Sequence, residues 1–318
     1  MKVPFMPFSS KTKSHAAGWF AISFGAHGIY LAKIQFTGSM PTVVHCEYHA
    51  TESVSAAALE KLRRVANLDN HDVSTLLSPG EYQMLLIEAP NVPTNEMKMA
   101  VRWKIKGDLT CHIDDAMVDM VQIPGSKSSS GRPQSLYAIA ATNGIINDRI
   151  KLFEQAKIHL DVIDIPEMAQ RNIAALFERV DRALVVLAFD DNGGLMTFTS
   201  GGELYMSRRI DISVGQLLDA NENLRQQYRD RVETELQRSL DYFDRQHSQL
   251  AVDLVLICVP DNTGLVEFLA SQLGNKIRKL DLSQVMDISA VPALADSEFV
   301  AHTLPVLGAA LRQESRVP

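Results

Sequence analysis

The sequence repeats one order of secondary-structure elements, first from about Trp19 and again from about Ala183. In each copy, three short strand-like segments are joined by tight turns, and a helix and further alternating strands and helices follow. The spacing of Phe20, Ile22 and Phe24 at every second position is typical of a strand. Hairpin-linked strands that lead into β-α-β segments predict a mixed sheet covered by helices. We therefore expect two similar α/β halves that face each other across a cleft.

The repeat also sets the expected boundaries. Residues 1–15 show no periodicity and are expected to form a flexible tail, residues 16–180 the first half, and residues 181–318 the second. Pro166 favours the first turn of a helix, whose inward-facing residues would be Ala169, Ile173, Phe177 and Val180. A long amphipathic helix of about 25 residues is expected in the second half, where apolar residues recur at Leu224, Tyr228, Val232, Leu236, Leu240 and Phe243.

Charge and cysteine content exclude several classes of function. Acidic residues outnumber basic ones by 38 to 31, and the formal net charge is −7. This disfavours a general nucleic-acid binder, which needs clustered Lys and Arg to neutralise phosphates. The three cysteines, Cys46, Cys111 and Cys258, are far apart and form no C-x-x-C pair. The sequence therefore predicts neither a metal site nor a disulfide framework, and it fits a reducing cytoplasm.

The apolar segments are too short to cross a membrane. The longest unbroken one is Ala183–Phe189. The uncharged stretch Ser14–Ala32 follows several lysines and resembles a signal peptide, but Gly18, Gly25 and Gly28 interrupt any apolar core. We expect this stretch to be part of the folded protein.

Several longer segments carry a resemblance to a known family. They are Ala100–Met120, Tyr137–Ile150, Val162–Phe177, Gly201–Ile212, Leu236–Phe243 and Leu304–Arg312. Together they resemble the PilM-like proteins of type IV pilus assembly, in particular those of the mannose-sensitive haemagglutinin (MSHA) pilus, and the cytoplasmic domains of type II secretion platforms. The resemblance implies an actin-like (ASKHA, RNase H-like) duplicated fold, with two halves around a cleft. It also implies an inserted subdomain at about residues 81–123 and a C-terminal helix that returns to the first half.

The resemblance implies a function that depends on binding other proteins. PilM-like proteins are cytoplasmic adaptors that lie at the inner membrane and bind the cytoplasmic tail of a PilN-like platform protein in a groove of their first half; the assembly motor is a second candidate partner. A groove of this kind needs apolar pockets and backbone hydrogen bonds. We nominate Val101, Trp103 and Ile105 as partner-binding residues, with the alternative that they belong to the core of a helix.

The nucleotide-binding residues of the superfamily are only partly present. In nucleotide-binding relatives an Asp in an Asp-x-Gly pattern positions Mg²⁺, which prefers carboxylate oxygen. The first turn reads Ser23-Phe24-Gly25, without a carboxylate. In the second half, Phe189 stands at the corresponding position, and Asp190 and Asp191 are displaced by one or two residues. The segment Cys258–Asn262 replaces the Gly-Gly of active relatives. The resemblance therefore implies a scaffold without ATP turnover.

Two alternatives to a simple adaptor stay open: an actin-like ATPase and a nucleotide-binding sensor that uses ATP and Mg²⁺ without turnover. We nominate no catalytic residue and no metal ligand. The residues expected to line a vestigial nucleotide cleft are Ser23, Gly25, Gly28, Asp190, Asp191 and Gly193.

Overall fold

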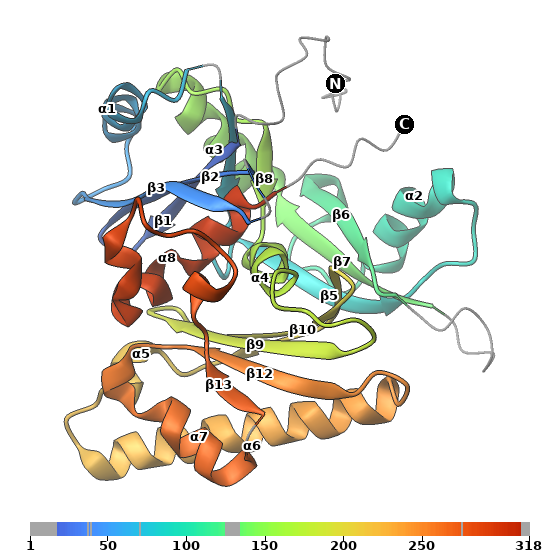
Figure 1. The fold of residues 1–318 in the computed structure, drawn as a ribbon. Coiled ribbons are helices and arrows are strands. Elements are labelled where there is room, and N and C mark those ends of the chain that lie inside the picture. Colours follow the sequence, from blue (N-terminus) through green and yellow to red (C-terminus); the bar gives the residue numbers. More distant parts are fainter. Residues whose placement is uncertain are drawn as a thin grey trace.

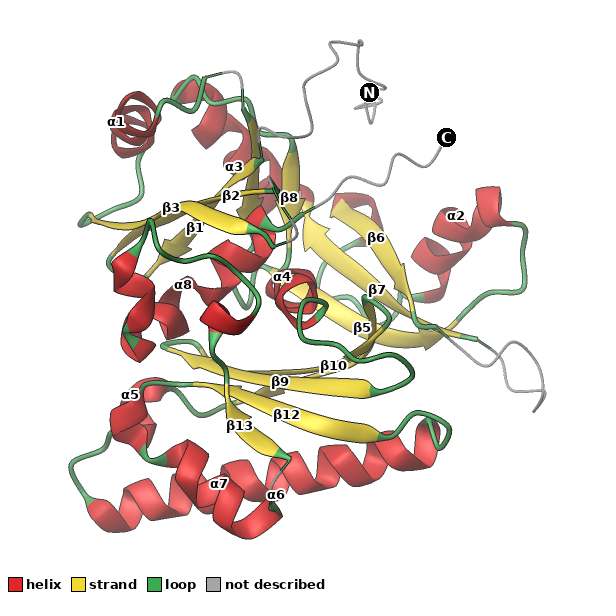
Figure 2. Ribbon diagram, viewed as in Figure 1, coloured by secondary structure: helices red, strands yellow, loops and turns green. Residues whose placement is uncertain are grey.

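The computed structural model describes residues 18–312 apart from 37, 39, 70, 125–133 and 275. The segment 1–15, predicted to be a flexible tail, lies outside the described residues. Three β-sheets and the helices that cover them make up the fold (Figures 1 and 2).

The first sheet has five strands in the order β3–β2–β1–β4–β8. Its strands are β1 (Trp19–Gly25), β2 (Gly28–Gln35), β3 (Thr42–Ala50), β4 (Asp72–Leu76) and β8 (Val162–Asp164). β1, β2 and β3 are antiparallel neighbours, whereas β4 pairs with β1 and β8 pairs with β4 in parallel. Gly25 pairs with Gly28, so that only Ala26 and His27 form the turn between β1 and β2.

The second sheet has the same order and the same strand directions, β11–β10–β9–β12–β13. Its strands are β9 (Ala183–Asp190), β10 (Gly193–Ser200), β11 (Glu203–Ile210), β12 (Val252–Cys258) and β13 (Ile277–Lys279). Asp190 pairs with Gly193, which leaves Asp191 and Asn192 as the turn between β9 and β10. The two large sheets are therefore copies of one topology, and each begins with a tight hairpin.

A third, antiparallel sheet has the order β5–β7–β6. Its strands are β5 (Tyr82–Glu88), β6 (Ala116–Gln122) and β7 (Ser135–Thr142), and α2 (Thr94–Lys104) packs on one of its faces. Val101 of α2 and Ile105, directly after the helix, belong to a common buried cluster with Leu136 of β7. The central strand β7 lies beyond residues 81–123, the segment predicted for the inserted subdomain.

Four helices cover the outer faces of the large sheets. They are α1 (Ala56–Ala66), α3 (Asn143–Gln155), α6 (Glu222–Gln246) and α7 (Leu265–Leu273). Leu59 of α1 and Phe153 of α3 pack with Ile22 on the first sheet, while Leu236 of α6 packs with Phe198 on the second. The long helix expected in the second half is confirmed, since α6 has 25 residues. The remaining short elements are α5 (Val214–Leu217) and 3-10 turns at Ile113–Asp115, Asp261–Thr263, Leu282–Gln284 and Pro292–Ala295.

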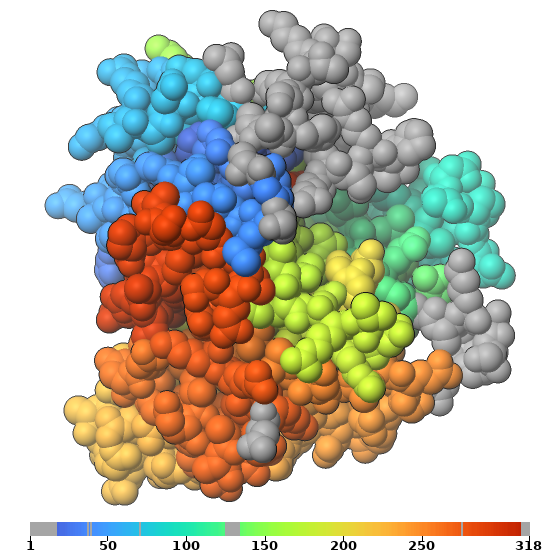
Figure 3. Space-filling view, viewed as in Figure 1, coloured from blue at the N-terminus to red at the C-terminus, as the bar shows by residue number. Residues whose placement is uncertain are grey.

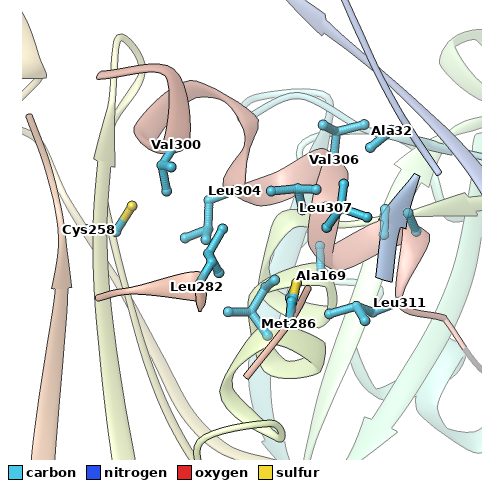
Figure 4. Packing of buried hydrophobic residues seen from close by; sticks show 14 of the residues in the cluster. Ala32, Ala169, Cys258, Leu282, Met286, Val300, Leu304, Val306, Leu307 and Leu311 are labelled. Atoms are coloured by element: carbon cyan, nitrogen blue, oxygen red, sulfur yellow. The ribbon is translucent and has the colours of Figure 1, made fainter. Parts of the chain in front are cut away.

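Two helices, α4 (Pro166–Ala174) and α8 (Ser297–Ala310), lie between the large sheets (Figure 1). A single buried cluster joins them to both sheets: it contains Ala32 of β2 and Cys258 of β12 as well as Leu304 of α8. Figure 4 shows this packing, with Ala169 of α4 beside α8. The largest buried cluster is therefore formed where the two halves meet.

One expectation for α4 is wrong. The helix ends at Ala174, and Val180, which was expected to face inward on it, is 88% exposed. Asp181 has a positive φ of 57°, so the chain turns sharply before it enters β9. Leu176 and Phe177 still pack against the buried cluster after the helix ends, so the expectation fails only at Val180.

Candidate functional site

A cleft lies between the two hairpin turns, one from each large sheet. Ser23 and Gly25 line it from β1, and Asp190, Asp191 and Gly193 line it from the β9–β10 hairpin. Helices α4 and α8, the loop after β4, Tyr30 and Arg209 also line the cleft. Because each hairpin joins the first two strands of its sheet, the duplication itself brings the two turns together. Five of the six residues expected to form a nucleotide cleft thus lie around one site.

The sixth residue, Gly28, has a different role, and its assignment to the cleft is corrected here. Gly28 is buried at the start of β2, and a Cβ atom on it would lie 2.4 Å from the Tyr48 ring and 2.5 Å from the carbonyl oxygen of His49. The position therefore needs glycine for the close approach of β2 and β3.

An aromatic ring lies against the first turn. A Cβ atom on Gly25 would come within 2.7 Å of the Tyr30 ring, so the ring packs directly on this glycine. The ring also stacks on His302 of α8, with centroids 6.3 Å apart and an interplanar angle of 9°. Burial, together with the charges of Tyr48 and the two aspartates of the second hairpin, raises the pKa of the Tyr30 hydroxyl to about 12. Tyr30 is therefore a neutral group that occupies space beside the turn.

The carboxylate of Asp190 is held by its own turn. Its Oδ1 atom accepts a hydrogen bond of 2.7 Å from the backbone N–H of Asn192. This is the local bond by which Asp commonly builds a tight turn. Burial raises the pKa of Asp190, and the hydrogen bonds from Asn192 offset this effect only in part. The structure thus gives Asp190 a turn-forming role.

The second aspartate, Asp191, lies at the mouth of the cleft. Its side chain is 60% exposed, and its Oδ2 atom lies 3.8 Å from Nδ1 of His302. Since His302 also stacks on Tyr30, a chain of three side chains runs from β2 through α8 to the β9–β10 turn. These contacts close one side of the cleft.

The space left between the turns is small. The cleft has a volume of about 80 Å³, whereas pockets for small molecules usually measure about 300–1,000 Å³. In this conformation the cleft is therefore smaller than a usual small-molecule pocket.

A larger cavity lies at the ends of β12 and β13. It measures about 480 Å³, and its wall includes Cys258 and Lys279. Lys279 donates a hydrogen bond of 2.7 Å to Asp261, in the segment where active relatives are expected to have Gly-Gly. Burial raises the pKa of the Cys258 thiol to about 12, so this group is a neutral, apolar part of the wall.

A network of side chains at the inner end of the cleft joins the second sheet, the three-stranded sheet and α4, and no sequence pattern predicts it. Arg209 of β11 donates to Glu167 of α4 at 2.9 Å and to the hydroxyl of Tyr82 of β5 at 2.7 Å. The Tyr82 hydroxyl in turn donates to Glu167. Burial and the charge of Glu167 raise the pKa of Tyr82, so the hydroxyl keeps its proton. The three residues stand far apart in the sequence, and no local pattern links them.

The residues nominated for partner binding separate into two kinds. Val101 and Ile105 are fully buried under the three-stranded sheet, which excludes direct contact with a partner, and their nomination is corrected in favour of the core alternative. Trp103 is 64% exposed. Of the three, only Trp103 can touch another molecule.

Neither a metal site nor a membrane span is found in the part of the chain that the structure describes. Within residues 18–312, less the omitted positions, no group of three or more His, Cys, Asp or Glu side chains is arranged to hold a metal ion. Among the described helices, none is both long enough and apolar enough to cross a bilayer.

Comparison with known proteins identifies the fold. The chain is similar to a chain of the solved PilM–PilN type IV pilus biogenesis complex, with a TM-score of 0.73 and 18% identity over 93% of this chain and 98% of that one. The fold is actin-like, as the resemblance implied. No protein-family model matches the sequence, and no curated protein is similar to it in sequence.

Other solved structures are less similar to this chain. The cytoplasmic domain of EpsL, an inner-membrane component of the type II secretion system of Vibrio cholerae, has a TM-score of 0.43 and 10% identity over 64% of this chain and 75% of that one. A Bacteroides thetaiotaomicron protein with an actin-like ATPase fold has a TM-score of 0.47 and 10% identity over 88% and 96% of the two chains.

Proposed function

We propose that this protein is an adaptor of type IV pilus assembly that acts by binding other proteins and does not turn over ATP. The observation that carries the proposal is the extent of the likeness to the chain of the PilM–PilN complex. The part of this chain outside the match is 7%, or about 22 of 318 residues. The three-stranded sheet with α2 spans more residues than that, so the likeness extends into this sheet as well as the duplicated core.

The geometry of the cleft supports a role without ATP turnover. Ser23 offers no carboxylate, and the carboxylate of Asp190 is hydrogen-bonded within its own turn. Mg²⁺ is usually held by one or two carboxylates together with the substrate phosphates. Tyr30 packs on Gly25, beside the turn where a phosphate would have to enter. These contacts favour a fixed joint between the halves.

The partner proposed for the adaptor is the cytoplasmic tail of a PilN-like inner-membrane platform protein, bound in the first half. The pilus would be of the MSHA type, and the assembly motor would be a second partner. On this proposal the protein is cytoplasmic and reaches the inner membrane through its partner. We also propose that the boundary between its two halves lies between residues 180 and 181.

Tail binding can be measured with synthetic peptides. Labelled peptides that correspond to the cytoplasmic tails of inner-membrane pilus proteins encoded near this chain would be titrated with the full chain and followed by fluorescence anisotropy. We expect one tail to bind saturably and its scrambled version not to bind. If none of the tails binds, the adaptor proposal is wrong while the fold assignment stands.

The alternative function is a nucleotide-binding sensor or ATPase. It is favoured by the meeting of five expected residues at one cleft and by the nearby cavity at Cys258. Thermal unfolding with and without Mg-ATP tests binding, and phosphate release tests turnover. If the protein is an adaptor without ATP turnover, Mg-ATP should not change the unfolding temperature and no phosphate should be released. Turnover that is lost in both Asp190→Ala and Asp191→Ala variants would establish the alternative.

A further inference from the structure

The outer face of α2 carries two large apolar side chains in solvent. Met99 is 66% exposed and Trp103 is 64% exposed. They stand four residues apart, so they lie next to each other on the helix surface. Among the described residues, they are the one pair of strongly exposed large apolar side chains at that spacing on a helix. Val101 and Ile105 are fully buried on the opposite side, so Met99 and Trp103 are not needed to attach α2 to its sheet.

Lysines surround this apolar pair. The ammonium group of Lys106 lies 5.4 Å from the centroid of the Trp103 ring. At about 100° per residue, Lys98 and Lys104 lie at the two sides of the helix, each about 120° from the middle of the exposed face. The Lys104 ammonium donates to the backbone carbonyl oxygen of Glu88, and Lys98 lies 3.4 Å from Asp119. The apolar pair therefore has one lysine against it and a further lysine at each side of the helix.

The charge distribution favours a lipid surface over a protein partner. Trp is common at both kinds of interface, but lysine is depleted in protein–protein interfaces. At membrane surfaces, in contrast, Trp rings lie at the level of the headgroups, and the ammonium groups of lysines lie near anionic headgroups. The outer face of α2 has this combination of Trp and lysine. The acidic residues on this side are Glu96 in the first turn of α2 and Asp119, the partner of Lys98.

We propose that the outer face of α2, made of Met99 and Trp103 with Lys98, Lys104 and Lys106, binds the surface of a membrane that contains anionic lipids. The inference rests on the proposed function, which brings the protein to the inner membrane through a partner's tail. Figure 3 shows the α2 region (teal) as a lobe at the edge of the molecule, where a flat surface can reach it. Figure 1 shows α2 on the side of the three-stranded sheet that faces away from the other sheets.

Such a contact is weak by itself and gains strength from tethering. Each lysine near an anionic surface strengthens binding by about 5-fold. A protein already held by a flexible tail binds its second site as an intramolecular event, so even a weak affinity adds to attachment. The α2 face would thus orient the adaptor beneath the membrane once the tail has captured it.

The two tryptophans allow a direct test with the full chain. Trp19 is only 8% exposed, whereas Trp103 is 64% exposed, so a change in fluorescence on binding should come from Trp103. We expect vesicles of phosphatidylglycerol and phosphatidylethanolamine to shift the emission to the blue, and vesicles of phosphatidylcholine to have no effect. Bromine atoms on the phosphatidylglycerol acyl chains should quench Trp103. The blue shift should be absent in Trp103→Phe and should weaken as salt is added.

Co-sedimentation with the same vesicles measures affinity and includes a matched control. Changing both Lys104 and Lys106 to Glu should weaken binding at least about 25-fold, and Met99→Ser with Trp103→Ser should abolish sedimentation. The control is Lys61→Glu with Val65→Ser on α1. These are a lysine and an exposed apolar residue that stand four residues apart, as Met99 and Trp103 do. We expect this control to bind like the parent.

Three results would overturn the proposal: no binding to anionic vesicles, equal loss of binding in the α1 control, or a Trp103 shift caused by a partner's tail peptide without lipid. The last result would make α2 a peptide-binding face. Tail binding is measured separately without vesicles, so failure of the membrane contact and failure of the adaptor function are distinguishable.

Discussion

Gly308 of α8 lies directly against the backbone of Ala169 in α4, so closely that an added Cβ would be 2.1 Å from the Ala169 carbonyl oxygen. The helices approach here because residue 308 has no side chain, and Asn172 donates a hydrogen bond of 2.9 Å to the Gly308 carbonyl oxygen. Since α4 and α8 lie between the two large sheets, this contact fixes how closely the halves meet.

Replacing this glycine tests the contact. Gly308→Ala should lower the free energy of unfolding by roughly 1–3 kcal/mol, because the obstacle is backbone and cannot turn away. Gly144→Ala is the control: it is also in a helix, but its Cβ would meet its nearest neighbour at 3.8 Å. That variant should be neutral or slightly more stable. Urea unfolding measures the stability of both variants. An equal effect of the two substitutions would show that α4 and α8 are not in tight contact at Gly308.

The network of Glu167, Arg209 and Tyr82 should also stabilise the junction. Glu167 has a side chain that is 3% exposed, and removing it takes a charged acceptor from the Tyr82 hydroxyl and from Arg209, whose side chain is 38% exposed. Glu167→Ala should therefore cost about 1.5–3 kcal/mol in the free energy of unfolding. Asp148→Ala, which removes the partner of Lys151 in an ion pair whose side chains are 67% and 81% exposed, should cost less than about 1 kcal/mol. Denaturant titration of both variants compares them, and similar losses would argue against the network.

Cysteine reactivity provides a chemical test of burial. Burial raises the pKa values of Cys46 and Cys258 to about 12, and only the thiolate form reacts rapidly with disulfide reagents. Cys111 is partly exposed. In the native protein we expect one thiol to react with Ellman's reagent, and Cys111→Ser should remove this reaction. In denaturant all three thiols of the parent should react. A second fast thiol in the native protein would contradict the burial of Cys46 or Cys258.

The parts of the fold that local patterns encode were predictable from the sequence. The 25 residues of α6 follow a regular apolar spacing, and the two copies of the hairpin-first sheet are visible as a repeat. The helix with Val101 and Ile105 was found in the same way, but a periodic pattern does not tell which apolar residues stay exposed. Trp103 on the same helix is exposed, and only the packing on the three-stranded sheet shows it.

The candidate site was predictable only where it is made of turns. Ser23 and Asp190 could be paired because each stands at the first hairpin of its sheet. The packing of the Tyr30 ring on Gly25 could not be inferred, because it depends on the direction in which the side chain turns, and its stacking on His302 joins residues that are distant in the sequence. Tertiary packing alone decides them.

The pH dependence of stability should reveal the state of Asp190. Its pKa is raised above the ordinary value of 3.8 mainly by burial, so folding disfavours its ionised form. At pH values above the raised pKa, the buried charge lowers the free energy of unfolding by its full amount. This loss decreases as the pH falls through the raised pKa. It vanishes well below 3.8, where the carboxyl is protonated in both the folded and the unfolded state. Asp190→Asn keeps an oxygen that can accept the hydrogen bond from the backbone N–H of Asn192, and it removes the destabilising effect of the buried charge. This variant should be more stable than the parent at neutral pH and equal to it in acid.

The control for this prediction is Asp191→Asn, because the Asp191 side chain is 60% exposed and should change stability little at any pH. Urea unfolding of the parent and both variants at a series of pH values gives the comparison. A gain for Asp190→Asn that persisted in acid would mean that the side-chain amide packs better than the carboxyl group. A loss at neutral pH would mean that the charge of Asp190 stabilises its turn, or that it faces a cation in the cleft. The latter result would favour the nucleotide-binding alternative over a cleft that serves only as a joint.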